Sequence, residues 1–180
     1  MMHLGHYYMH PIVEKLKGGD RRSIGKSDEV VAEVLAEPGL FDIVFANMLS
    51  DDPVLCMRCA DAVEKITARH PEYLQPYKRA LIEQVACSEQ QEVRWHVAQM
   101  VPRLTLNARE RKKVVGILLN YLNDKSSIVR TFSMQALAGL AESDTKYRPQ
   151  VIQILAEAIQ TGTPAMKSRG RKLVKRLKAE

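Results

Sequence analysis

The sequence predicts an all-α fold, a right-handed superhelix of stacked helix pairs (an α-solenoid). A twelve-residue pattern returns four times along the 180 residues, beginning at Leu55, Val93, Val129 and Met166. The intervals between these starts are 38, 36 and 37 residues, and such a period is typical of helix pairs that cover one another's hydrophobic faces. No apolar stretch approaches the ~18 residues of a membrane span. We therefore expect about four helix pairs, preceded by N-terminal helices, and no membrane partner.

Each copy of the pattern predicts the second helix of a pair. The copies read LCMRCADAVEKI, VRWHVAQMVPRL, VRTFSMQALAGL and MKSRGRKLVKRL. Positions 1, 5, 8, 9 and 12 are mostly apolar or small, and at about 100° per residue they form one stripe along a helix. In the last copy, Gly170 at position 5 departs from this pattern.

A second amphipathic stretch precedes each copy and predicts the first helix of the pair. Short polar turns join the two helices, and Pro53 and Pro164 mark helix starts, because proline is tolerated in a first turn. The first helices are expected at residues 40–49, 74–87, 109–122 and 151–159. The repeat domain is expected at residues 38–180, with units at about 38–70, 71–106, 107–143 and 144–180.

Residues 1–37 are predicted to form an arm and capping helices. A short helix is expected from Pro11 to Lys17, stopped by two glycines, and a second from Asp28 to Glu37 with Ser27 as its N-cap. Between them, GGDRRSIGKS looks like a phosphate loop, but Asp20 stands where a Walker A motif needs its first glycine. We interpret it as a basic connector. Anion binding at the helix N-terminus stays open, through the cations Arg21, Arg22 and Lys26.

The paired-helix pattern resembles the HEAT-repeat family over residues 38–180. The third unit is the best match, with Asp124 in its turn and an apolar stripe after it, formed by Val129, Ala136, Leu137 and Leu140. The resemblance implies that an aspartate in the turn stacks against an arginine six residues later, here Arg130. Ser88, Ser50 and Thr161 stand at this place in the other units, so any such ladder is partial.

The sequence indicates a protein that is not an enzyme and holds no metal or cofactor. Cys56 and Cys59 form a Cys-x-x-Cys pair, but no second pair follows at metal-site spacing, so Cys59 is interpreted as a small core residue. No Ser/His/Asp arrangement or pair of carboxylates has a recognisable catalytic context. Three cysteines are few and odd in number, which favours a reducing compartment, the cytoplasm.

Positions 3, 7 and 10 of the second helices are expected to point away from the core. The resemblance implies that these helices line a concave face, and we expect that face to bind a protein partner. Trp95 could anchor such a partner, since tryptophan is enriched among residues that dominate interfaces, or could lie over the neighbouring helix as peripheral core. The candidate partner-binding residues are Met57, Asp61, Trp95, Gln99, Gln135, Lys172 and Lys175.

The net charge of +6 is concentrated in the last predicted helix. Residues 165–180 contain seven basic residues and one acidic residue, while the rest of the chain is balanced. This helix either caps and solubilises the end of the stack or forms a patch for nucleic acid or another polyanion. The candidate anion-binding residues are Arg169, Arg171, Lys172, Lys175 and Arg176.

Overall fold

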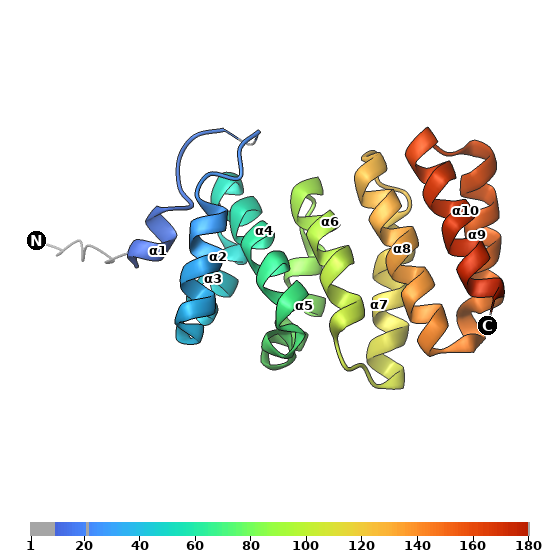
Figure 1. Cartoon of the computed structure of the whole chain (residues 1–180), viewed down its shortest axis with the longest axis horizontal. Helices are drawn as coiled ribbons and strands as arrows, with labels where there is room; N and C mark the ends of the chain where they lie inside the picture. The colour runs from blue at the N-terminus through green and yellow to red at the C-terminus, as the bar shows by residue number, and fades with distance from the viewer. Residues whose placement is uncertain (1–9, 21, 180) are drawn as a thin grey trace, which may run out of the picture. The chain divides into compact units, whose positions relative to one another are not determined.

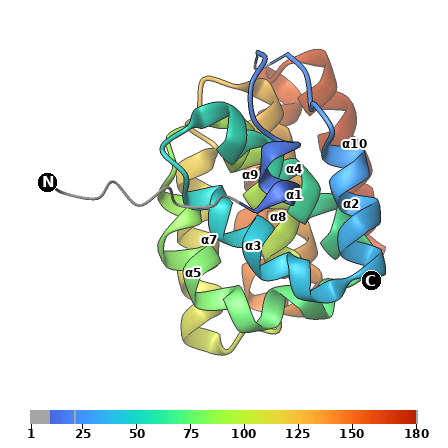
Figure 2. The same ribbon diagram turned by 90° about the vertical axis from the view of Figure 1, so that its left-hand side faces the viewer.

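The computed structural model describes residues 10–20 and 22–179, and its regular structure in these ranges is helical, without a strand. The chain divides into two compact units, Met1–Arg69 and His70–Glu180 (Figures 1 and 2). Arg21 of the predicted basic connector and the first nine residues of the predicted arm lie outside the described residues. No helix in the described ranges combines the length and the apolarity needed to cross a membrane.

The first unit is organised around its longest helix. Its α-helices are α1 (Pro11–Glu14), α2 (Ser27–Ala36), α3 (Phe41–Ala46) and α4 (Pro53–Arg69). Both α2 and α3 pack against α4, and short 3-10 turns, Pro38–Leu40 and Asn47–Leu49, flank α3. Pro53 begins α4, as predicted. Along α4 the predicted stripe is buried, including Cys59, because this helix has neighbours on two sides.

Ser27 is not the N-cap of α2. The N-cap is Lys26, which makes no side-chain cap hydrogen bond, and Ser27 is the first residue of the helix. Its buried hydroxyl donates instead to a carboxylate oxygen of Asp61 in α4, at 2.5 Å. A hydrogen bond to an ionised acceptor is stronger than one between neutral groups. The Ser27 hydroxyl therefore links α2 to α4 and does not cap the N-terminus of α2.

Two predicted partner-binding residues are buried in this unit. Met57 is 6% exposed and Asp61 is 8% exposed, so the expectation that both point away from the core is wrong. The reason is α2, which packs along α4 and covers this face. Lys65 completes the polar contact, since its ammonium binds both Asp28 of α2 and Asp61 of α4.

The loop between α1 and α2 is wrapped around a buried arginine. Arg58 of α4 is 3% exposed, and its guanidinium donates to backbone carbonyl oxygens from both sides of the loop. Gly25 has a φ of +58°, and a Cβ atom there would lie 2.7 Å from Nη1 of Arg58, so only glycine fits. A cation from α4 therefore organises the predicted basic connector. The four acceptors are the carbonyls of Leu16, Lys17, Asp20 and Ser23.

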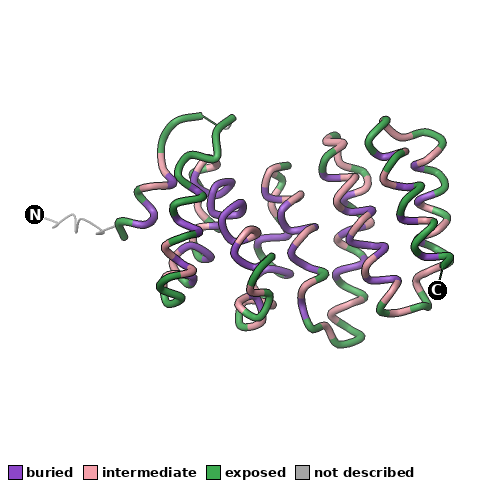
Figure 3. Tube along the Cα trace, viewed as in Figure 1, coloured by how far each residue is buried: buried purple, intermediate pink, exposed green. Residues whose placement is uncertain are grey.

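The second unit has two layers of helices. The second helices of its pairs are α6 (Gln91–Met100), α8 (Ser127–Ser143) and α10 (Pro164–Lys178), and α8 contacts both α6 and α10. The first helices are α5 (Lys78–Glu83), α7 (Ala108–Tyr121) and α9 (Arg148–Thr161), of which α7 and α9 pack against α8. Figure 3 shows buried residues recurring along these helices at helical spacing, as the repeated stripe predicts.

Side chains at their N-termini explain where several of these helices begin. Asn107 and Glu110 form a capping box at α7, and Ser126 accepts a hydrogen bond from an amide in the first turn of α8. Thr163 caps α10, and Pro164 is its first residue, as predicted. Each cap satisfies an amide that has no partner within its own helix.

Two predicted first helices are not continuous α-helices: the one at residues 40–49 turns into a 3-10 turn at Asn47–Leu49, and the one at 74–87 is broken. Residues 74–87 form a 3-10 stretch (Pro71–Tyr77), the six-residue α5, and a 3-10 turn (Val85–Cys87). Pro76 lies inside the 3-10 stretch, where it has no amide proton for an α-helical hydrogen bond.

Gly170, the exception in the last copy of the pattern, is buried. A Cβ atom at this position would lie 2.9 Å from Cγ1 of Ile159 in α9 and 3.5 Å from the terminal methyl of Met134 in α8. The missing side chain therefore allows α10 to approach both neighbours closely.

Candidate functional site

The structure brings three predicted site residues together in a groove of the second unit. This α6–α8 groove has a volume of about 250 Å³, and it lies between α6 with the 3-10 turn after it (Val101–Arg103) and α8, with one contribution from α10. Gln99 and Gln135 face it from the two sides, and Arg176 contributes from α10. The full lining is Ala98, Gln99, Pro102, Arg103, Phe132, Gln135, Ala136, Gly139 and Arg176.

Gln135 carries an unsatisfied acceptor in this groove. Its side-chain Oε1 is buried and has no hydrogen-bond partner in residues 10–20 and 22–179. The amide of Gln99 is engaged, since its Nε2 donates to the carbonyl oxygen of Trp95 at 3.2 Å. Leaving a buried acceptor unpaired costs about 1–3 kcal/mol, so the side chain would gain from a rotation that brings Oε1 to a donor.

The α10 end of the groove is held by an ion pair. Arg176 binds the carboxylate of Glu142, near the C-terminal end of α8. Arg176 is thus a candidate for both predicted roles, because it lines the groove and belongs to the basic surface of α10.

Trp95, Lys172 and Lys175 lie outside the groove lining. Trp95 is partly buried on α6, with its ring 5.6 Å from that of His96. Lys172 and Lys175 are exposed on α10. The remaining candidates, Met57 and Asp61, are buried in the first unit.

The exposed surface of α10 is basic over most of its length. Arg169 is partly buried, so it contributes less to this surface than the other predicted anion-binding residues. The exposed cations are Arg171, Lys172, Lys175, Arg176 and Lys178.

Sequence reasoning missed Phe132 and Arg103 in the groove. Phe132, Gln135, Ala136 and Gly139 follow the i, i+3, i+4, i+7 spacing of one helix face, which is the signal that could have found the aromatic ring. Arg103 follows α6 in a 3-10 turn, and helical periodicity does not place such a residue.

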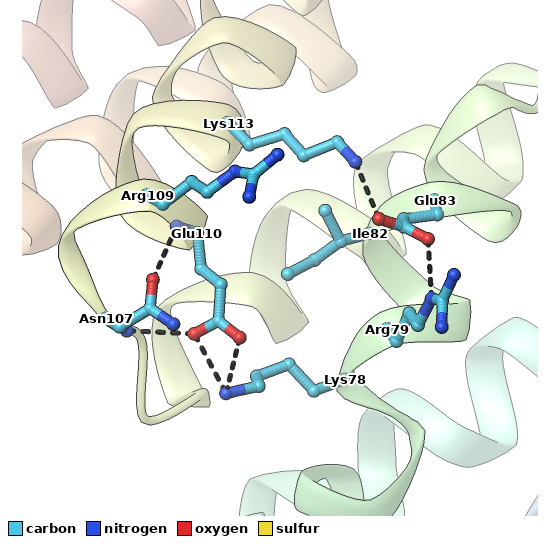
Figure 4. A pocket seen from close by; sticks show the side chains of 8 residues that line it. All are labelled: Lys78, Arg79, Ile82, Glu83, Asn107, Arg109, Glu110 and Lys113. Atoms are coloured by element: carbon cyan, nitrogen blue, oxygen red, sulfur yellow. Dashed lines mark hydrogen bonds and ion pairs between the residues drawn. The ribbon is translucent and has the colours of Figure 1, made fainter.

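A second cavity lies between the first helices α5 and α7 (Figure 4). This α5–α7 pocket has a volume of about 360 Å³. The sequence predicts no residue of this pocket as a site, because its cations and carboxylates come together from helices about thirty residues apart. Its lining is Lys78, Arg79, Ile82, Glu83, Asn107, Arg109, Glu110 and Lys113.

Ion pairs determine the protonation of the carboxylates in this pocket. Hydrogen bonds from Lys113 and then Arg79 lower the pKa of Glu83 to about 2. A hydrogen bond from Lys78, followed by the backbone amide of Asn107, lowers the pKa of Glu110. Both carboxylates are therefore ionised at neutral pH.

Asp124 forms its ion pair with Arg94 of α6 and not with Arg130. Its carboxylate accepts a hydrogen bond from Nη1 of Arg94 at 2.7 Å, while Nε of Arg94 donates to the carbonyl of Ser88. Burial raises the pKa of Asp124, but hydrogen bonds from the Ser126 amide and Arg94 outweigh it, so the net shift is downward. Nε of Arg130 is buried without a hydrogen-bond partner in the described part of the chain.

The two buried cysteines, Cys56 and Cys59, are poor nucleophiles at neutral pH. Burial, with a smaller contribution from Asp52, raises the pKa of Cys56 to about 11, and burial also raises the pKa of Cys59. The thiolate is the reactive and metal-binding form, so both sites are inert. No group of three or more His, Cys, Asp or Glu residues in the described ranges is placed to hold a metal ion.

Comparison with known proteins shows the fold class alone. No family model matches the sequence, and no curated protein matches it. The structure is similar to the crystal structure of an engineered protein, a target of the Northeast Structural Genomics Consortium, with a TM-score of 0.63 and 17% sequence identity. The match covers 93% of this chain and 78% of the engineered one. At that identity, the likeness extends to an all-α fold and to nothing more specific.

Proposed function

We propose that this chain is a HEAT-like α-solenoid and acts as a protein-interaction module without enzymatic activity. Its partner is a protein segment that lies in the α6–α8 groove. The order of helix contacts in the second unit supports the solenoid, since α8 packs against the second helix of the pair before it and of the pair after it.

The observation that carries the function is the unpaired Oε1 of Gln135. Buried polar groups in folded proteins almost always have a partner, and an exception requires an explanation. A bound segment toward which the half-buried Gln135 side chain turns would supply the missing hydrogen from a backbone amide. Phe132 and Pro102 beside it offer apolar contact, which suits a peptide better than a phosphate chain.

A photo-crosslinking amino acid at position 99 tests this proposal in native lysate. The crosslinker replaces Gln99 in the groove or, as a control, the exposed Gln160 on α9. We expect position 99 to capture one protein that position 160 does not capture, and nuclease treatment to leave the product unchanged. Equal products from both positions, or products that nuclease removes, would contradict the proposal.

The captured protein then allows a measurement of affinity. Gln135→Leu removes the unpaired acceptor and is expected to weaken binding several-fold, because one hydrogen bond contributes about 0.5–1.5 kcal/mol. Gln160→Leu makes the same chemical change outside the groove and should bind like the parent protein. If both variants bind alike, Gln135 takes no part in recognition.

A second candidate function, binding of nucleic acid or another polyanion, is favoured by the exposed cations of α10. Release of counterions from neutralised phosphates would make affinity fall steeply with salt and depend little on base sequence. Lys172→Gln with Lys175→Gln tests this separately, because neither residue lines the groove. If labelled DNA binds this variant as tightly as the parent protein, α10 is a solubilising cap.

A further inference from the structure

Two ion pairs of opposite direction join α5 to α7 across the α5–α7 pocket. Lys78 of α5 binds Glu110 of α7, and Lys113 of α7 binds Glu83 of α5, each at 2.8 Å. Figure 4 shows the side chain of Ile82 between the two pairs. The space between them therefore has charged ends and an apolar residue in the middle, and its volume of about 360 Å³ is within the range of ligand pockets.

The cations of this pocket outnumber its carboxylates. Glu83 is held by Lys113 on one oxygen and by Arg79 on the other. Glu110 is held by Lys78 and by the backbone amide of Asn107. Four cations and two carboxylates line the pocket, which leaves an excess of two positive charges.

Arg109 carries part of this excess. Arg109 is an exposed residue of the lining, and its guanidinium has no hydrogen-bond or ion-pair partner in the part of the chain that the structure describes (Figure 4). Glu83 and Glu110 each already accept hydrogen bonds from two groups, and neither has a hydrogen bond or ion pair with Arg109. An anion from outside is the group that would complete the site.

We propose that the α5–α7 pocket binds the carboxylate of an acidic residue from a protein partner, with Arg109 as the anion-binding group. The guanidinium is a planar fork whose donors match the two oxygens of a carboxylate. Ile82 and the methylene stems of Lys78 and Lys113 contact the aliphatic part of the same residue. This site lies on the first helices, so it is separate from the α6–α8 groove and does not depend on the function proposed for that groove.

The two carboxylates in the lining favour an isolated acidic side chain over a nucleic acid. A duplex carries one negative charge per roughly 1.7 Å of its axis, so phosphates on either side of the bound one would meet Glu83 and Glu110. A single Asp or Glu flanked by neutral residues presents one negative charge to Arg109. It places no further negative charge near Glu83 or Glu110.

NMR titration of the full-length, ¹⁵N-labelled protein tests this inference. The probe is a blocked peptide with one glutamate between leucines, and the matched probe has glutamine in its place. We expect the glutamate peptide to shift the backbone amides of Ile82, Arg109 and Lys113 at millimolar concentrations, and to bind at least fivefold more tightly than the glutamine peptide. Equal affinities of the two peptides, or no shift at these amides, would overturn the proposal.

Charge-matched variants identify the binding group. Arg109→Gln should weaken the glutamate peptide at least fivefold, and Arg109→Lys should give an intermediate loss, because it keeps the charge without the fork. Lys112→Gln removes the same charge from an exposed neighbour outside the pocket lining and should change the affinity less than twofold. An equal loss in Lys112→Gln, or tighter binding of a DNA duplex at the same amides, would overturn the proposal.

Discussion

The α2–α4 interface of the first unit and the α6–α8 groove of the second carry polar residues at the same position of the repeated pattern. Position 7 is Asp61 in α4, Gln99 in α6 and Gln135 in α8. In the first unit, Ser27 and Lys65 satisfy the carboxylate of Asp61, and the residue is buried. In the second, Oε1 of Gln135 is buried beside a cavity without a partner in the described residues.

The difference shows that position in a repeat does not determine what a residue does. A buried polar group that has all its partners holds two helices together, and its loss is measured as lost stability. A buried polar group that lacks a partner costs stability, and it gains a partner only if its side chain turns toward a ligand. We therefore expect substitutions at position 7 to change stability in the first unit and binding in the second.

The largest effect is expected for Arg58→Ala in the first unit. This change leaves four loop carbonyls without their donor. The bond to Leu16 is buried and its loss costs about 1–3 kcal/mol, while the other three are partly buried and cost less, so the free energy of unfolding should fall by about 3 kcal/mol. Urea unfolding would measure it. Arg69→Ala, at the exposed end of the same helix, is the control and should cost less than about 0.5 kcal/mol. If the two variants unfold at the same urea concentration, Arg58 does not hold the loop.

Asp61→Ala is expected to have the next largest effect. It removes the acceptor of the buried Ser27 hydroxyl and one partner of Lys65, which should lower the free energy of unfolding by about 1–3 kcal/mol. Asp28→Ala removes the other partner of Lys65, but from an exposed residue, and should cost less than about 1 kcal/mol. Thermal unfolding would show which variant is less stable. A larger loss of stability in Asp28→Ala than in Asp61→Ala would contradict the structural role given to Asp61.

Gln135→Leu should leave stability unchanged or raise it by up to about 1 kcal/mol. Replacing an unpaired buried acceptor with an apolar side chain of similar size removes a desolvation cost. The same urea unfolding experiment applies. A loss as large as that of Asp61→Ala would mean that Gln135 is structural, and the assignment of the α6–α8 groove as a binding site would lose its support.

The smallest effect concerns the pH dependence of the α5–α7 pocket. The pKa of Glu83 is lowered from 4.5 to about 2, so its ion pairs stabilise the folded state above pH 4.5, and this contribution is lost as the pH falls through about 2. An NMR titration of the Glu83 carboxyl should give a higher midpoint in Lys113→Gln and a smaller increase in Arg79→Gln, following the order of the two causes. Unchanged midpoints would show that the pairs do not persist in solution.

The parts of the fold that depend on a single helix could be predicted from the sequence. The stripe of the second helices and the starts at Pro53 and Pro164 follow from helical periodicity and the chemistry of proline. The burial of Met57 and Asp61 could not be predicted from the sequence, because it depends on the packing of α2 along α4. The break in the predicted helix at residues 74–87 could not be predicted either, since a 3-10 helix tolerates Pro76 at a place where an α-helix would exclude it.

The candidate sites were predictable only in part, for a related reason. Gln99 and Gln135 were identified from their position on the helix face, but the unpaired Oε1 depends on every neighbour around it. The α5–α7 pocket is built from pairs such as Lys78 with Glu110 and Glu83 with Lys113. Their members are 32 and 30 residues apart, so no local pattern connects them.

Arg130 shows what copying a repeat would do to this chain. Arg94 meets Asp124 in the turn of the following helix pair, whereas the turn that follows Arg130 carries Thr161 at that place. In a tandem duplication of residues 107–143, the turn that follows the first copy of Arg130 would carry the second copy of Asp124. If the inserted pair packs like its parent, these two residues would form an ion pair. Each added copy would bring one new ion pair, and the number of unmatched arginines would remain the same. The third unit is therefore complementary to itself, and lengthening the protein with copies of residues 107–143 would add matched polar contacts.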